Sequence, residues 1–150
     1  MAPSVILSVK TMELAYSIDQ LIALDTAAGY FDLHNCYEVV RVHSEGTMCS
    51  VDFAKLAGEW IKPTDPAYVT LVFEQVSFLQ LSEGLQLPIG LEHIGFKEPA
   101  ESEMVWFMPQ PGNGPVHMVL MLDDEAFIRI GAAASYCLPN PLASLTESGS

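Results

Sequence analysis

Short segments in which apolar and polar residues alternate, each ended by a turn signal, constrain the fold of this chain more than any other feature. Residues 34–43 and 47–54 alternate on either side of a turn at 44–46, and residues 68–76 (YVTLVFEQV) alternate again. A period of two residues is typical of a strand with one buried face. The pattern therefore predicts a hairpin followed by a third strand, with Val69, Leu71 and Phe73 facing the core.

Register within the hairpin can also be predicted. With Glu45-Gly46 as a two-residue turn, Val42 faces Cys49 and Val40 faces Val51. These apolar pairs would make a core face on which Cys49 is a small buried residue, as an unpaired cysteine usually is.

The second half of the chain repeats the same pattern of short apolar segments and turns. Turn signals lie at 82–84, in the sequence QPGNGP (110–115) and at 123–125. The strands predicted between them are 78–81, 91–96, 104–108, 116–122 and 126–138.

One segment near the N-terminus has helical rather than strand spacing. Ser17 and Gln20 fit a capping box, apolar residues recur at helical spacing from Ile18, and Gly29 is a suitable stop. These signals predict a single amphipathic helix over 18–28.

Together these elements predict a mainly β (α+β) fold. The expected architecture is an antiparallel β-sandwich or open barrel of about seven to eight strands with one N-terminal helix. Residues 1–12 are expected to be a flexible lead-in, 13–138 a single globular domain, and the Pro-rich end 139–150 a disordered tail.

The charge balance limits the kind of partner. Six Lys and Arg against nineteen Asp and Glu give a formal net charge of −13. Such a surface repels nucleic acid and anionic membranes, so we expect neither as a partner. It either serves solubility or docks a basic protein, with electrostatic attraction raising the association rate.

Three cysteines and four histidines are the residues that could carry chemistry. His34 and Cys36 share a strand face, but no C-x-x-C or H-x-x-x-H pair supplies the further ligands that zinc needs. We therefore predict no metal, no cofactor and no catalytic residue. An enzyme with a site assembled from His34, His93 or His117 is the alternative left open.

Acidic loops and an exposed tryptophan are the candidate partner-binding residues. A loop Trp is a suitable interface anchor, and clustered carboxylates suit a basic partner. The candidates are Trp60, the loop residues Glu98, Glu101 and Glu103, and the turn residues Asp123, Asp124 and Glu125.

Two short segments resemble motifs of a known family. Leu71, Phe73, Val76 and Leu79 fit the pattern Leu-x-Phe-x-x-Val-x-x-Leu, and His34-Asn35 stands where the family has His-Asp, with Phe31 two residues too early. Over residues 30–138 the chain thus resembles a family of small β-rich bacterial immunity proteins of polymorphic toxin systems. The resemblance implies a protein that binds and blocks a toxin domain and carries no catalytic residues.

The expected function is therefore a cytoplasmic acidic binding protein, most simply an immunity protein that neutralises a basic toxin domain by stoichiometric binding. The odd, sparse cysteines suit a reducing cytosol, and the N-terminus lacks the basic region and cleavage site of a signal peptide. The second hypothesis is a small-ligand-binding β-barrel with a cavity lined by Met104, Trp106, Met118 and Met121.

Overall fold

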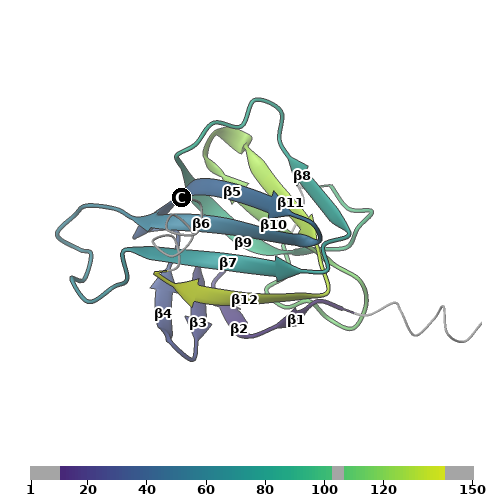
Figure 1. Cartoon of the computed structure of the whole chain (residues 1–150), viewed down its shortest axis with the longest axis horizontal. Coiled ribbons are helices and arrows are strands. Elements are labelled where there is room, and N and C mark those ends of the chain that lie inside the picture. The colour runs from purple at the N-terminus through teal and green to yellow at the C-terminus, as the bar shows by residue number, and fades with distance from the viewer. Residues whose placement is uncertain (1–10, 103–106, 141–150) are drawn as a thin grey trace, which may run out of the picture.

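The computed structural model describes residues 11–102 and 107–140, and the regular secondary structure in this part of the chain is almost entirely β-strand (Figure 1). The prediction of a mainly β chain is confirmed. The strands are β1 (Glu13–Leu14), β2 (Tyr16–Asp19), β3 (Ala23–Thr26), β4 (Gly29–Asp32), β5 (Tyr37–Glu45), β6 (Met48–Lys55), β7 (Tyr68–Glu74), β8 (Phe78–Leu81), β9 (Ile89–Lys97), β10 (His117–Leu122), β11 (Phe127–Gly131) and β12 (Ala134–Pro139).

Nine of these strands form one large sheet in the order β1-β12-β7-β6-β5-β9-β10-β11-β8. Neighbours are antiparallel except β1 and β12, which run parallel, so the sheet is mixed rather than purely antiparallel. Its edges are β1 and β8, and the sheet is therefore open. The three remaining strands form a small sheet, β2-β3-β4.

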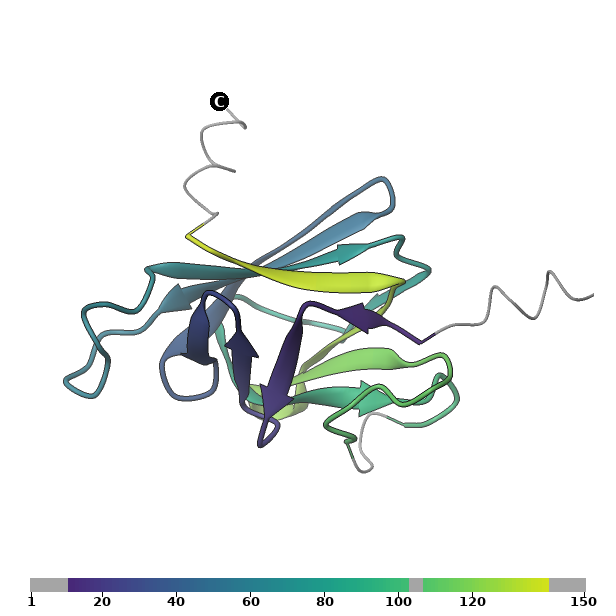
Figure 2. The same cartoon turned by 90° about the horizontal axis from the view of Figure 1, so that it is seen from below.

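The large sheet bends where β5 meets β9, because these strands share only the pairs Glu38↔Gly90 and Val39↔Ile89. Figure 2 shows the result as two layers. We call β12, β7, β6 and β5 the front layer, and β9, β10, β11 and β8 the back layer. Both layers contribute to one core, for which Phe73 and Ile130 are examples, each 0% exposed.

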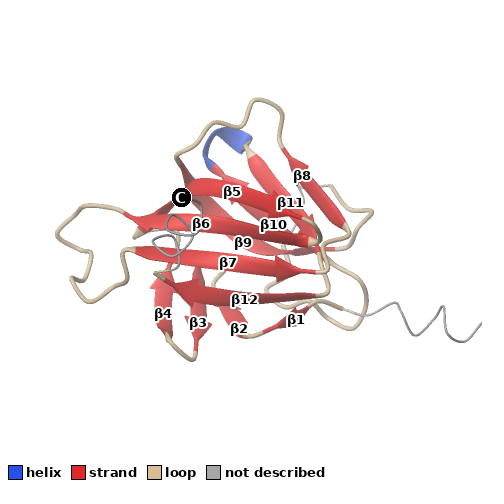
Figure 3. Cartoon of the chain, viewed as in Figure 1, coloured by secondary structure: helices blue, strands red, loops and turns tan. Residues whose placement is uncertain are grey.

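The predicted helix over 18–28 is wrong, because this segment forms β2, β3 and the turn between them. Tyr16 and Ile18 are buried and Ser17 is exposed, which is a strand period. Gln20 and Leu21 both have positive φ and make the turn, and the carbonyl of Leu21 accepts a hydrogen bond from the Ile94 amide (2.7 Å). Contact with β9 thus overrides the helical spacing. The single helical turn of the described chain is η1 (Asp123–Glu125), blue in Figure 3.

The predicted hairpin is present, but its register differs from the prediction. The strand begins at Tyr37 rather than His34, and Glu45 pairs with Met48, so the turn is Gly46-Thr47. A bulge at Val40 then changes which residues face the core: Val39 lies inward before it and Val42 after it. Strict alternation could not reveal this extra residue.

Cys49 is buried and unpaired, as predicted, although its partner across the hairpin is Ser44 rather than Val42. Burial raises the pKa of its thiol to about 11. The predicted inward face of 68–76 is also confirmed, since Val69, Leu71 and Phe73 are each 0% exposed.

The last predicted strand, 126–138, is two strands in different layers. β11 lies in the back layer beside β10 and β8, whereas β12 lies in the front layer beside β7. The chain crosses between layers at Ala132-Ala133. The prediction of about seven to eight strands was too low, because this segment and the predicted helix each contain two strands and because β1 and β4 were not predicted.

Candidate functional site

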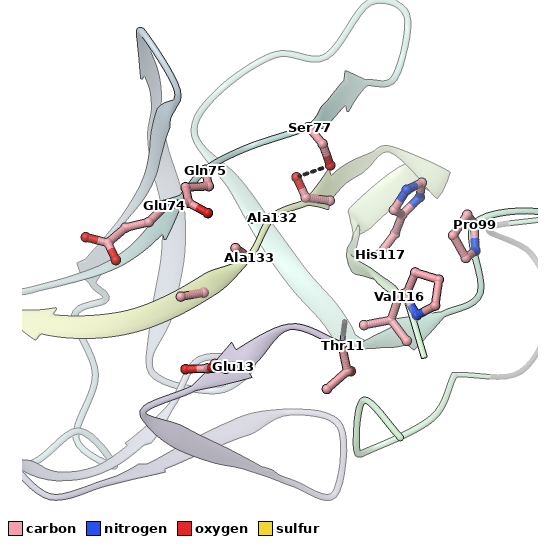
Figure 4. Close-up of a pocket in the computed structure, with 13 residues that line it drawn as sticks. Thr11, Glu13, Glu74, Gln75, Ser77, Pro99, Val116, His117, Ala132 and Ala133 are labelled. Atoms are coloured by element: carbon pink, nitrogen blue, oxygen red, sulfur yellow. Dashed lines mark hydrogen bonds between the residues drawn. The ribbon is translucent and has the colours of Figure 1, made fainter. Parts of the chain in front are cut away.

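A groove of about 720 Å³ lies beside this crossing between the layers (Figure 4). A pocket of this size is within the range that binds small ligands or a few residues of a partner, about 300–1,000 Å³. Five parts of the chain line it: residues 11 and 13, residues 74, 75 and 77 at and after the end of β7, Pro99, residues 115–117 at the start of β10, and residues 131–134 at the crossing from β11 to β12.

The groove is hollow because its floor carries almost no side chains. Ala132, Ala133 and Ala134 follow one another along it, and Gly131 precedes them. Gly131 has a steric reason to be glycine, since an added Cβ would lie 2.9 Å from Cδ2 of His117. The run of small residues at 131–134 therefore makes room for the groove.

Two glutamates flank Ala134, the last residue of this floor. In the sheet register Glu13 pairs with Ala134, and Ala134 pairs with Glu74, so the three residues form one row across β1, β12 and β7. Both glutamates are exposed, whereas the next row, Leu14–Ser135–Phe73, belongs to the core side. With strands about 4.8 Å apart, the two glutamate Cα atoms are separated by roughly 10 Å.

His117 forms the opposite wall of the groove. Its Nδ1 accepts a hydrogen bond from Nε of Arg129 (2.9 Å), so the ring proton is on Nε2. The ring stacks on Phe78 with 4.5 Å between centroids. Burial, together with the neighbouring guanidinium of Arg129, lowers the pKa of His117 and favours the neutral ring. Its Nε2–H is thus a fixed neutral donor at the groove.

Arg129 also fixes the first predicted docking loop. The side chain is 3% exposed and donates to the backbone carbonyls of Glu101 (2.7 Å), Glu98 (3.0 Å) and Pro99 (3.2 Å). The carboxylate of Glu101 in turn accepts from the Glu98 amide (2.8 Å), so part of its hydrogen-bonding capacity is used within the loop. Glu98 and Glu101 are exposed, and Glu103 lies outside the described residues.

The second predicted docking cluster lies at the other end of the back layer. β9 and β10 pair from Leu91↔Leu122, beside η1, to Lys97↔His117, beside the Arg129-bound loop. At about 3.3 Å per residue the two clusters are roughly 20 Å apart along the strands. The structure therefore does not join them into one patch.

Around η1 the structure adds acidic residues that the sequence did not group. Asp124 and Glu125 line a second cleft, of about 360 Å³, together with Glu83. Asp123 lies over Gly90, because a Cβ added at Gly90 would be 2.6 Å from Oδ2 of Asp123. Glu38 is the strand partner of Gly90 and so lies in the same region.

Trp60 is the most exposed of the large apolar side chains in the described chain, at 65%. It is nevertheless held in place. Its indole N–H donates to the carbonyl of Asn35 (3.0 Å), and its ring covers Gly58, where an added Cβ would lie 2.5 Å from the ring. An exposed but oriented aromatic ring loses little conformational freedom when a partner binds.

The histidines named in the enzyme alternative have separate partners. His34 Nδ1 lies 2.6 Å from the carbonyl oxygen of Leu91, and His93 packs edge-on against Phe107. No group of three or more His, Cys, Asp or Glu residues able to hold a metal ion occurs in residues 11–102 and 107–140.

The residues named in the ligand-cavity alternative do not line a cavity together in the described chain. Met118 is 0% exposed and belongs to the packed core, and Met121 is 9% exposed. Met104 and Trp106 lie outside the described residues.

Sequence reasoning missed Glu13, Glu74 and His117 as members of one groove. Glu13 and Glu74 become neighbours only through β12, which lies between them in the sheet although it is last in the chain. The one available signal was the run of small residues at 131–134, which strands with packed faces seldom contain.

Comparisons with protein-family models, with curated proteins and with solved structures give no match to this chain. Among the described residues, no helix has the length and apolar character needed to cross a membrane.

Proposed function

We propose that this protein is an immunity-type inhibitor, which binds a basic toxin domain in a stoichiometric cytosolic complex and blocks it by occlusion. One observation carries the proposal: in the described chain the exposed charges are nearly all carboxylates. The exposed acidic residues are Glu13, Asp25, Glu45, Glu59, Glu74, Glu83, Glu92, Glu98, Glu101, Asp123, Asp124 and Glu125.

The basic residues of the described chain are placed differently. Lys97 and Arg129 are buried, Arg41 and Lys55 are partly buried, and Lys62 is exposed. Lys55 Nζ already donates to the carbonyl of Asp65 (2.9 Å). A basic protein that approaches this surface thus meets carboxylates with few competing cations, an arrangement that raises association rates.

The motif shared with the immunity family supports the proposal only through the fold pattern. Leu71 and Phe73 are in the core, and Val76 and Leu79 pack against it. The resemblance therefore concerns packing, and the surface charge carries the functional argument. The free thiols of Cys36, Cys49 and Cys137 fit a reducing compartment.

The proposal is tested by immobilising this protein, using it to capture a partner from an extract of the source cells, and then titrating the isolated partner with this protein. We expect a basic protein that binds one to one, and whose association slows when salt rises from about 0.05 to 0.5 M, because screening then acts over about 4 Å instead of about 14 Å. An association rate that ignores salt, or unaided turnover of a substrate by the purified protein, would rule out this function.

Variants distinguish charges that speed association from a side chain that slows dissociation of the complex. The charge reversal Glu125→Lys should mainly slow association, whereas Trp60→Ala should mainly speed dissociation, by about tenfold or more if Trp60 is the anchor. Met48→Ala, which truncates another exposed apolar side chain, is the matched control for Trp60 and should leave both rates within about twofold.

A further inference from the structure

The groove beside the layer crossing combines negative charge, space and a fixed donor. It lies apart from the acidic clusters that the sequence singled out, except that Pro99 of the Arg129-bound loop forms part of its wall. In Figure 4 the two glutamates lie on one side of the groove and His117 on the other.

Among the described residues, the two carboxylates have no counter-ion. The groove lining contains Glu13 and Glu74 but no Lys or Arg, and neither glutamate side chain forms an ion pair within the described chain. They lie in one row with Ala134 between them, so a cation placed above this alanine can contact both. The small side chain of Ala134 leaves that position open.

The shape of this pair favours one kind of cation. A guanidinium is planar and carries five N–H donors in a rigid fork, so it can donate to carboxylates on two sides at once, whereas an ammonium is a compact point charge. With the Cα atoms roughly 10 Å apart, each glutamate side chain can reach inward to one edge of such a plane.

His117 supplies a different kind of contact. Since Nδ1 is occupied by Arg129, the Nε2–H is the free donor, and within the described chain it has no hydrogen-bond partner. A neutral N–H suits a carbonyl oxygen, which an arginine residue carries on its own backbone.

We propose that this groove is an arginine-binding site, in which a partner's guanidinium lies between Glu13 and Glu74 and its backbone carbonyl accepts from His117. This inference rests on the proposed function and names the part of the basic partner that enters the protein. The groove volume of about 720 Å³ accommodates an arginine together with its neighbouring backbone.

The probe is the peptide acetyl-Gly-Arg-Gly-amide, titrated into the full-length protein and followed by amide NMR shifts. Its control replaces arginine with citrulline, which keeps the shape and removes the charge. We expect the arginine peptide to shift the amides of residues 131–134 and 117, and the citrulline peptide to bind at least about tenfold more weakly.

Variants locate the effect. The double variant Glu13→Gln/Glu74→Gln keeps the side-chain shape and should weaken binding of the arginine peptide by about tenfold or more. The matched control is Glu92→Gln, which neutralises an exposed carboxylate on β9 and should change affinity by less than about twofold. All three positions are exposed, so the variants should fold.

Three results would overturn the site: equal binding of the citrulline peptide, shifts that map elsewhere, or the same loss in Glu92→Gln. A lysine peptide that binds as tightly as the arginine peptide would overturn the guanidinium assignment. The captured partner separates this inference from the proposed function. If it binds the double variant like the wild type while remaining salt-dependent, the groove is wrong and the function stands; if its association ignores salt, the function fails.

Discussion

Asp52 in the front layer and Arg129 in the back layer are both buried charged side chains on the face that points away from the core. Asp52 lies between the core residues Val51 and Phe53 on β6, and Arg129 lies between Ile128 and Ile130 on β11. Their surroundings differ. Each guanidinium nitrogen of Arg129 donates a hydrogen bond, whereas Asp52 Oδ1 accepts from the Thr70 hydroxyl and its Oδ2 has no partner among the described residues.

The difference lies in what each charge connects. Arg129 joins β11 to β10 through His117 and to the loop at 98–101, which is about thirty residues away in sequence. Asp52 joins only the neighbouring strands β6 and β7, which the sheet already holds together. We infer that Arg129 determines local structure and that Asp52 contributes little to stability.

Phe73→Ala sets the scale for this comparison, because it removes a fully buried aromatic ring from the core shared by both layers. We expect a loss of about 3–5 kcal/mol in the free energy of unfolding, measured by denaturant titration. An unchanged midpoint would contradict the burial of this strand face.

Arg129→Met should cost about 3 kcal/mol, because it leaves the carbonyl oxygens of the loop at 98–101 and His117 Nδ1 without the donor that the buried guanidinium supplies. Hydrogen exchange in the loop at 98–101 should increase in the same variant. The control is Arg41→Met, which removes a partly buried arginine from the front layer and should cost less than about 1 kcal/mol. Equal losses in the two variants would remove the distinction between the layers.

Asp52→Asn should change the free energy of unfolding by less than about 1 kcal/mol. Asparagine still accepts from Thr70, and the substitution removes a buried charge that lacks a full set of partners. Thr70→Val in the wild-type background should cost more, about 1–3 kcal/mol, since it leaves the carboxylate with no donor. A loss above about 2 kcal/mol in Asp52→Asn would show that the charge is stabilising.

The smallest expected effect is the pH dependence contributed by His117. Its pKa is lowered from 6.5 in the folded protein, so the unfolded chain binds more protons as pH falls through that value. Stability should therefore decrease from pH 7 to pH 5, and less steeply in His117→Gln than in the wild type. Parallel pH profiles for the two proteins would show that His117 titrates alike in both states.

The sequence by itself determined the local features of this protein. Alternation in 68–76 identified the inward face of β7, and alternation of Cys49 with Val51 and Phe53 on its own strand identified the buried face of β6. The net charge of −13 also follows from composition alone. The two burial patterns depend on residues close together in the chain, and the net charge does not depend on how the chain folds.

Tertiary structure decided the rest, because it depends on contacts between distant residues. The hydrogen bond from the Ile94 amide of β9 stabilises the turn at Leu21, so a segment with helical spacing forms two strands instead. The bulge at Val40 shifts the register of the hairpin. The groove needs β12 to lie between β1 and β7, which places Glu13 and Glu74, sixty-one positions apart in the chain, in one row on either side of Ala134. No local pattern encodes that neighbourhood, since strand order follows from how the layers bury their shared core.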